Sequence, residues 1–318
     1  MKSIAAALLL LILIPFSGFA IGADSANFTL VPLGNGVWAA IAKEGGKAGG
    51  NAGFVVGDDG VAVIDTFEDP AAAVELLARI REITKLPIKF VVNTHYHLDH
   101  VNGNDVFAAA GAIVFAQRNV RSWIRTENLH LFGEHIPPAL EARIESLPLP
   151  DVTYDDGVDL HLGRDLQVRY YPGHTGGDSI VVVSGANIVF CGDLLWKDHF
   201  PNLIDASTDK WIDTLNKFQA NYGTYTLIPG HGGVAGAEDL AAFKNYLIDL
   251  RVAVEKAQAD GKSGDALVDA VRPGLLSKYG NWGWSEDFAK SNILQTAEEL
   301  AGTKRIPSVP TDNPKHKP

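Results

Sequence analysis

Residues 91–100 read Val-Val-Asn-Thr-His-Tyr-His-Leu-Asp-His and continue the apolar run that begins at Ile88. An apolar run of this length is typical of a buried strand. The side chains that follow its end fall in a loop, where they can converge on one point. His95 and His97 stand two residues apart, so both would point the same way from an extended backbone. A solvated loop would explain one histidine, but this cluster of imidazoles and a carboxylate predicts a metal site.

Three further candidate ligands each follow another apolar segment. The run 166–171 precedes Pro-Gly-His174, the run 187–191 precedes Gly-Asp193, and the run 225–228 precedes Pro-Gly-His231. Glycine permits the sharp turn that would aim each side chain inward. One histidine after Pro-Gly is usually an ordinary loop residue. Repetition of the pattern at four strand ends, the His95 and His97 loop included, argues against chance and predicts a shared site.

The rest of the chain alternates between predicted strands and helices. Asp69-Pro70 has the form of a helix start, with Asp69 as N-cap and Pro70 at the first helical position. The strands predicted on either side of this helix would form a parallel crossover unit. The glycines between 45 and 53 suit either a hairpin connection or a flap beside a site. Further strands are expected over 28–31, 36–42, 60–66, 112–116 and 179–184, and helices over 104–110, after Ser207 and, as the last, over 240–254.

Composition limits the function. The chain has 318 residues, of which 46% are hydrophobic and 20% charged, and its formal net charge is −11. No extended run of lysine and arginine occurs, so nucleic acid is not expected as a partner and a small-molecule substrate is. The only cysteine is Cys191, which excludes an intramolecular disulfide. His130 and His135 lie in the helical or irregular segment 117–150, and we expect them at the surface or at a substrate rim.

The amino terminus has the features of an export signal. Lys2 precedes an apolar run from Ile4 to Phe16, and small residues lead to Ala20 or Ala23 as cleavage points. We therefore expect a signal peptide over 1–23, a domain with a carboxy-terminal helical extension over 24–305, and a disordered proline-rich tail over 306–318. The expected location is the periplasm or outside the cell, without stable membrane insertion. An uncleaved anchor is the alternative.

The motifs together closely resemble those of the metallo-β-lactamase superfamily. The resemblance runs from about Phe28 to Tyr246 and rests on four motifs in order: His-Tyr-His-Leu-Asp-His at 95–100, Pro-Gly-His174-Thr, Gly-Asp193 and Pro-Gly-His231-Gly. It implies an α/β fold, the αβ/βα four-layer sandwich of two mixed β-sheets with flanking helices.

The resemblance also implies a ligand set. His95, His97 and His174 would hold one metal ion, Asp99, His100 and His231 would hold a second, and Asp193 would bridge them. Two Zn²⁺ are the simplest pair, with iron or manganese as alternatives found in relatives. Such a pair activates a bridging hydroxide, which Asp99 would orient. Cys191 is expected to pack in the preceding strand and not to bind metal.

Two positions depart from the subclass B1 β-lactamases. Those enzymes have cysteine where Asp193 stands and arginine where His100 stands, so the chain looks more like the wider branch with glyoxalase II and lactonase members. The segment 201–207 nevertheless resembles a B1 loop, which makes Asn202 a candidate oxyanion donor. Lys197 is a candidate for binding a substrate carboxylate, although it lies one residue later than the B1 lysine; a solvated loop lysine is the alternative.

The expected function is therefore an exported binuclear metal-dependent hydrolase that cleaves a carbonyl-type bond, with a β-lactam as the most specific candidate. A lactonase or a glyoxalase II-like thioesterase is the alternative within hydrolases. A mononuclear iron sulfur dioxygenase would use the same fold for a different reaction. A non-enzymatic metal-binding module is disfavoured because the implied ligand set is complete.

Overall fold

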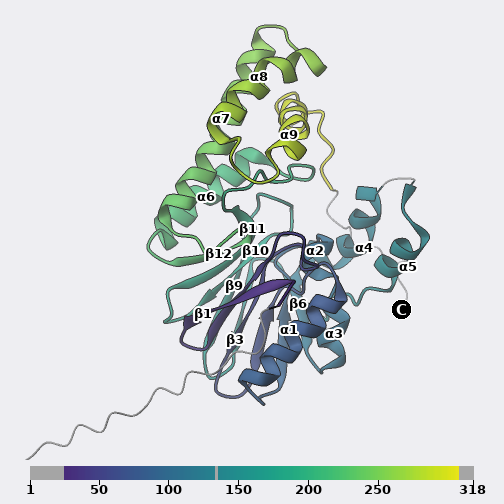
Figure 1. Ribbon diagram of the computed structural model, residues 1–318, viewed down its shortest axis with the longest axis vertical. Coiled ribbons are helices and arrows are strands. Elements are labelled where there is room, and N and C mark those ends of the chain that lie inside the picture. Colours follow the sequence, from purple (N-terminus) through teal and green to yellow (C-terminus); the bar gives the residue numbers. More distant parts are fainter. Residues whose placement is uncertain (1–24, 133–134, 308–318) are drawn as a thin grey trace, which may run out of the picture.

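A computed structural model describes residues 25–132 and 135–307. Its centre is a pair of mixed sheets that lie face to face, as predicted (Figure 1). The first sheet has the strand order β1-β2-β3-β4-β5-β6-β7, in which β1 to β4 pair antiparallel and β4 to β7 pair parallel. Its strands are β1 (Phe28–Gly34), β2 (Val37–Ala42), β3 (Ala52–Val56), β4 (Val61–Ile64), β5 (Ile88–Val92), β6 (Ile113–Gln117) and β7 (Val152–Tyr154).

The second sheet has the order β12-β11-β10-β9-β8. Only its β11–β12 pair is parallel among the pairs described. Its strands are β8 (Gly157–His161), β9 (Asp165–Tyr170), β10 (Ser179–Val183), β11 (Ile188–Trp196) and β12 (Thr226–His231). Apolar side chains from both sheets, such as Val55 and Ile64 from the first and Val181 and Phe190 from the second, form one buried cluster between them. Burial of this inter-sheet core is the main force that holds the two halves together.

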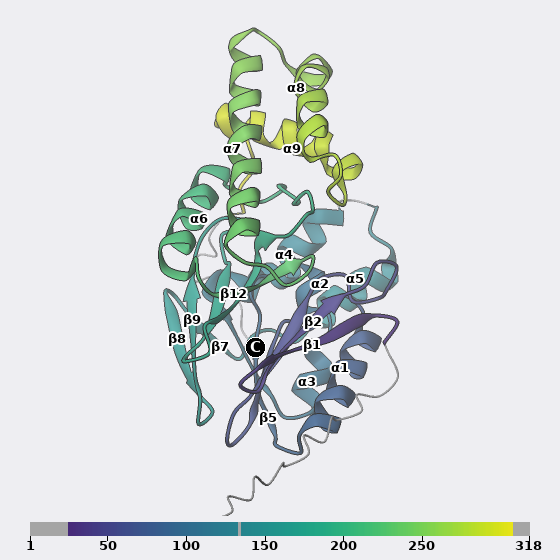
Figure 2. The same ribbon diagram turned by 60° about the vertical axis from the view of Figure 1, so that its left-hand side comes forward.

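Helices cover the outer face of each sheet (Figure 2). The first sheet is covered by α1 (Pro70–Ile83) and α3 (Asn104–Ala109), and the second by α6 (Thr208–Tyr222) and α7 (Ala237–Ala259). The predicted start of α1 is confirmed, because Asp69 accepts a hydrogen bond from the Ala71 amide at 2.8 Å and Pro70 is the first helical residue. Between β5 and β7 lie the short α2 (Leu98–Val101), α4 (Arg118–Phe132) and α5 (Pro138–Ser146).

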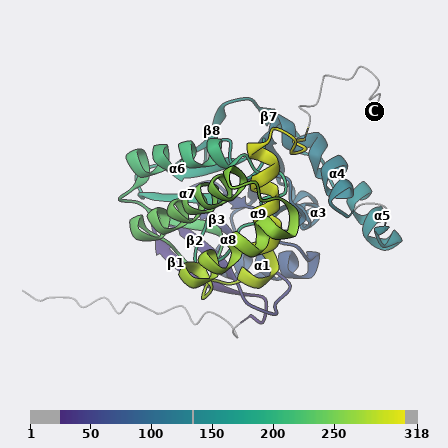
Figure 3. The same ribbon diagram turned by 90° about the horizontal axis from the view of Figure 1, so that it is seen from above.

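The helix predicted as the last one is followed by two more. After α7 come α8 (Gly264–Tyr279) and α9 (Ser285–Leu300), which lie with α7 over one end of the sandwich (Figure 3). The expectation that α7 ends the fold is therefore wrong. Pro273 lies inside α8, where a proline normally interrupts the helical pattern. Buried residues of all three helices, such as Leu247, Leu275 and Ile293, join the core on the outer face of the second sheet.

The strand that carries Asp193 is longer than predicted. The apolar pattern places its end at Cys191, whereas β11 continues to Trp196 with pairing irregularities on both sides of Gly192. The predicted signal peptide lies outside the described residues, as does the tail from residue 308 onward. Within the described residues, no helix has both the length and the apolar character needed to cross a membrane.

Candidate metal centre

Five segments bring all seven predicted ligands to one end of the sandwich. His95 and His97 lie in the loop after β5, and Asp99 and His100 lie in the short α2 that follows it. His174 comes from the loop after β9, Asp193 from β11 and His231 from the end of β12. Their possible donor atoms form two groups, each with all atoms within 4.8 Å of one another: His95, His97, His174 and Asp193 in the first, and Asp99, His100 and His231 in the second.

The Asp193 carboxylate faces both groups. Its Oδ2 lies 3.2 Å from His174 Nε2 in the first group and 3.4 Å from His231 Nε2 in the second. Its Oδ1 lies 3.0 Å from His100 Nε2. Within the second group, Asp99 Oδ2 lies 3.2 Å from both His100 Nε2 and His231 Nε2. This is the arrangement expected of a carboxylate shared between two metal ions.

The donor atoms fit bound metal because several have no other partner. His95 Nε2, His100 Nε2, His231 Nε2 and Asp193 Oδ1 are buried and lie within ion-pair distance of other candidate ligands, but none has a hydrogen-bond partner among the described residues. A buried polar atom without a partner costs about 1–3 kcal/mol. Metal ions coordinated at these atoms would remove that cost.

The electrostatics of the site favour a bound cation. Burial lowers the pKa of His174 to about 3, so its imidazole is neutral at pH 7. Burial alone would raise the pKa of Asp193, but His231 and His100 hold it well below its usual value. Burial likewise opposes a charge on His231, yet Asp193 and Asp99 raise the pKa of that imidazole to about 9. The site therefore favours a cation between its carboxylates, and a metal ion would replace the proton on His231.

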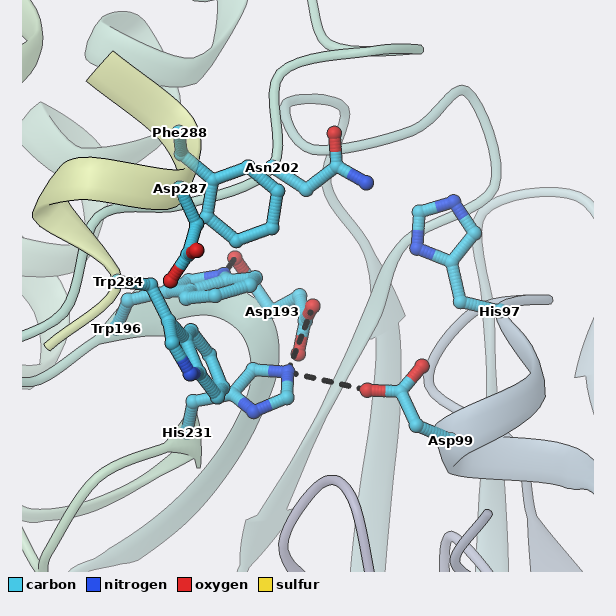
Figure 4. Close-up of a pocket in the computed structure, with 9 residues that line it drawn as sticks. All are labelled: His97, Asp99, Asp193, Trp196, Asn202, His231, Trp284, Asp287 and Phe288. Atoms are coloured by element: carbon cyan, nitrogen blue, oxygen red, sulfur yellow. Dashed lines mark hydrogen bonds and ion pairs between the residues drawn. The ribbon is translucent and has the colours of Figure 1, made fainter. Parts of the chain in front are cut away.

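An open pocket of about 360 Å³ lies directly over these ligands (Figure 4). Four of its lining residues, His97, Asp99, Asp193 and His231, are candidate ligands. Asn202 lies at its upper edge, and the remainder of the wall comes from four residues that the sequence analysis did not identify: Trp196, Trp284, Asp287 and Phe288. The last three belong to α9 and the residue before it, so the carboxy-terminal helices build part of the site.

Comparison with known proteins agrees with this geometry. The family model of the metallo-beta-lactamase superfamily matches residues 45–231, which is more than half of the chain. The chain belongs to this superfamily. The match ends at the last of the candidate ligands, so α7, α8 and α9 lie beyond it.

Individual relatives within the superfamily are distant. A hydroxyacylglutathione hydrolase of Brucella anthropi is 28% identical over 57% of this chain and 61% of its own length, so the match spans less than two thirds of that protein. A hydroxyacylglutathione hydrolase of Rhodospirillum rubrum is 24% identical over 75% of this chain and 82% of its own length. The solved metallo-beta-lactamase from Pontibacter korlensis is 22% identical, with a TM-score of 0.57 over 70% of this chain and 99% of that one. It shares the fold.

Residues behind the ligands of this superfamily member fix their orientation. Asp65 Oδ2 lies 2.9 Å from His100 Nδ1 and also accepts a hydrogen bond from Thr94 Oγ1 at 2.7 Å. A carboxylate on the far nitrogen of a histidine fixes the tautomer that presents its other nitrogen to metal. Asp65 was not predicted from the sequence as part of the site, although it too follows an apolar strand. On the other side, the Tyr96 hydroxyl donates to Asp205, whose Oδ2 lies 3.7 Å from His97 Nε2.

Glycines allow the segments to meet. A Cβ on Gly230 would lie 1.8 Å from Asp193 Oδ1, so a larger residue there would displace the shared carboxylate. Gly192, just before that aspartate, has φ of +50°, which L residues rarely adopt. The glycine-rich segment 45–53 joins the antiparallel strands β2 and β3 and also lies beside the site, since a Cβ on Gly50 would lie 2.6 Å from His100 Nε2. The segment is therefore a connection between strands that lies beside the site, and its action as a flap stays a prediction.

Of the two candidate substrate residues, one lines the pocket and the other does not. Asn202 lines the pocket, and its Oδ1 accepts a hydrogen bond from the Ile204 amide at 3.0 Å. Lys197 does not line it: its Nζ donates to the Val234 carbonyl at 3.0 Å and pairs with Asp239 at 3.2 Å. The geometry therefore does not support the predicted contact between Lys197 and a substrate carboxylate. Trp196, the last residue of β11, lines the pocket, whereas Lys197 lies in the bend that follows and its side chain turns toward Val234 and Asp239.

The remaining predicted positions lie apart from the ligands. Cys191 is fully buried in β11, where burial raises the pKa of its thiol, and it packs in the core of the second sheet. His130 and His135 are exposed, on α4 and just before α5. Neither histidine lines the pocket, so both are surface residues.

Proposed function

We propose that this superfamily member is a metal-dependent hydrolase that cleaves a carbonyl-type bond of a small molecule, with a thioester, ester or lactone as the preferred class. The observation that carries the proposal is the pair of ligand groups that meet at Asp193 on the floor of an open pocket. Two hydrolases among the relatives, named for a hydroxyacylglutathione substrate, support the thioesterase interpretation.

The proposed ligand sets are His95, His97 and His174 for one ion and Asp99, His100 and His231 for the other, with Asp193 shared. Histidine nitrogens and carboxylate oxygens suit Zn²⁺ best, and iron or manganese are compatible with the same donors. When bound, such a pair acidifies water and polarises a carbonyl group.

The protein's own side chains would assist in two ways. Asp99 lines the pocket and is ionised, because His100 and His231 hold its pKa well below the usual value although burial opposes this. Its carboxylate can therefore accept a hydrogen bond from a water molecule at the pocket floor and orient it. The hydrogen bond from Ile204 to Asn202 Oδ1 fixes the amide, whose NH₂ group can donate to an oxygen atom that gains negative charge.

A β-lactam is the less supported substrate. Asp193 and His100 depart from the B1 pattern, and Lys197 is occupied by Asp239. The mononuclear alternative is also less supported, because the second ligand group supplies three donors, as many as the first does apart from the shared Asp193. We further propose export, on the basis of the signal-like residues 1–23; amino-terminal sequencing of the mature protein would test this.

Hydrolysis of a substrate panel tests the proposed function. Zinc-loaded protein is assayed with a thioester, a simple lactone, a penicillin and a carbapenem. We expect turnover of the thioester or the lactone to exceed that of both β-lactams. Efficient cleavage of the β-lactams alone would restore the β-lactamase interpretation, and failure to hydrolyse any carbonyl compound would refute the hydrolase.

The same assay tests the two candidate substrate residues. Asn202→Ala should lower kcat by roughly 100-fold with metal content unchanged, because the amide acts mainly in the transition state. Lys197→Ala should leave kcat and KM close to those of the wild type and reduce the free energy of unfolding by no more than about 1 kcal/mol, the usual value of a partly exposed ion pair. An increased KM in Lys197→Ala, without loss of stability, would show that the lysine does bind substrate.

A further inference from the structure

The pocket has an aromatic wall that takes no part in metal binding. Trp284 is the centre of this wall: its ring centroid lies 5.6 Å from that of Trp196 and 6.2 Å from that of Phe288. Trp284 is 38% exposed, so its ring retains a free surface on the pocket side. Its φ of +57° is rare for a bulky residue. Strained backbone of this kind often marks a functional position.

A second lobe extends the pocket on the side of α4. It has a volume of about 300 Å³ and shares His97, Asp99, Asn202, His231 and Trp284 with the first lobe. The apolar residues Leu98, Leu131 and Phe132 line it, and Phe132 is 42% exposed. A substrate over the metal centre would thus have apolar surface on both sides.

Apart from the histidines, the ionisable side chains that line the two lobes are all acidic. Beyond the candidate metal ligands, Asp287 lines the first lobe and Glu68 lines the second, while no lysine or arginine of the described residues lines either. Two cations close to the site are already paired: Lys197 with Asp239, and Arg305 with Glu127. A carboxylate on the distal part of a substrate would meet no cation there.

Asp287 has a structural explanation that must be weighed against a role in the pocket. It lies in the first turn of α9, where an acidic residue stabilises the helix dipole. Its neighbour Glu286 lies in the same turn, pairs with Arg272 and does not line the pocket. Asp287 pairs with no cation among the described residues, and its carboxylate points into the pocket beside Phe288 (Figure 4). The helix dipole alone therefore does not require this carboxylate.

We propose, on the basis of the hydrolase function above, that the site selects carbonyl substrates whose distal group is apolar and cationic or neutral, and discriminates against those whose distal group is anionic. The apolar group would lie on Trp284 and Phe288. Tryptophan is the best aromatic face for a quaternary ammonium group, and a nearby carboxylate strengthens the attraction. Asp287 is thus assigned as the residue that determines charge specificity.

Binding of charge-matched ligands to zinc-loaded protein tests this inference without relying on turnover. The ligands are three 3-arylpropanohydroxamates, which share a metal-binding head and differ in a para substituent: trimethylammonium, methyl or sulfonate. Their Kd values are measured by calorimetry in the wild type, Asp287→Asn and Trp284→Ala. Glu286→Gln is the matched control, because it removes the same charge one residue away.

We expect the trimethylammonium ligand to bind at least about tenfold more tightly than the sulfonate, since the Asp287 carboxylate lines the pocket and acts in opposite directions on the two. Asp287→Asn should reduce this ratio several-fold, and Glu286→Gln should leave it within about twofold, because exposed charges outside the pocket are screened. Trp284→Ala should weaken the trimethylammonium and methyl ligands with zinc content unchanged.

Equal binding of the three ligands, tighter binding of the sulfonate, equal effects of the two charge substitutions, or no binding at all would each overturn the inference. These results are distinguishable from failure of the proposed function. If the ligand order holds but no carbonyl compound is hydrolysed, the selectivity of the pocket stands and the hydrolase does not. If thioesters are hydrolysed but the ligand order fails, the hydrolase stands and the proposed selectivity of the pocket does not.

Discussion

Asp193→Ala is expected to release one of two bound metal ions and to lower hydrolysis by at least roughly 100-fold, since even the loss of an outer partner of a ligand can cost that much. The Asp193 carboxylate reaches His174 in one ligand group and both His100 and His231 in the other. Its loss would leave positive imidazole or metal charges without the carboxylate between them. The measurements are metal content per chain and kcat/KM.

Cys191→Ser is the matched control for this substitution, two residues away in β11. The thiol is buried in the core of the second sheet and lies outside both ligand groups, so the variant should keep its metal content and activity. Cobalt-substituted protein gives a second readout. A thiolate charge-transfer band that disappears in Cys191→Ser would show that the cysteine binds metal and that the assignment to Asp193 is wrong.

His174→Ala is expected to remove most of the metal from the first ligand group and nearly all activity, a loss of roughly 100-fold or more. The side chain lies with His95, His97 and Asp193, and three donors would remain after its loss. Metal content should therefore fall while the fold persists, as measured by circular dichroism. Asn202→Ala, which changes the same pocket without touching a ligand, should keep its metal. An active His174→Ala variant with full metal content would remove His174 from the ligand set.

The clustering of the candidate metal ligands could be predicted from the sequence because each lies at or near the end of an apolar strand. Strand ends on one side of two packed sheets come together in space, so local patterns around His95, His174 and His231 indicate a three-dimensional cluster. Asp193 lies with the other candidate ligands although the strand that carries it is longer than expected. A local sequence pattern can therefore predict a cluster of side chains when the fold brings the ends of several strands together.

The aromatic wall of the pocket and Asp287 beside it could not be predicted in this way. Trp284, Asp287 and Phe288 follow the last metal ligand by about fifty residues and carry no motif. They reach the pocket only because α7, α8 and α9 fold back over the sandwich, which depends on long-range packing around residues such as Leu247 and Ile293. Lys197 shows the opposite difficulty: its position resembles a known pattern, but it lies one residue later, in the bend after β11, and its side chain pairs with Asp239 instead of lining the pocket.

The metal content of wild-type protein, measured together with activity before and after chelation, tests the central claim most directly. Protein purified without chelator should contain close to two metal ions per chain, as the two ligand groups require. Chelation should abolish hydrolysis, and addition of zinc should restore it in proportion to the metal bound. A metal-free protein that retains full hydrolytic activity would contradict the account.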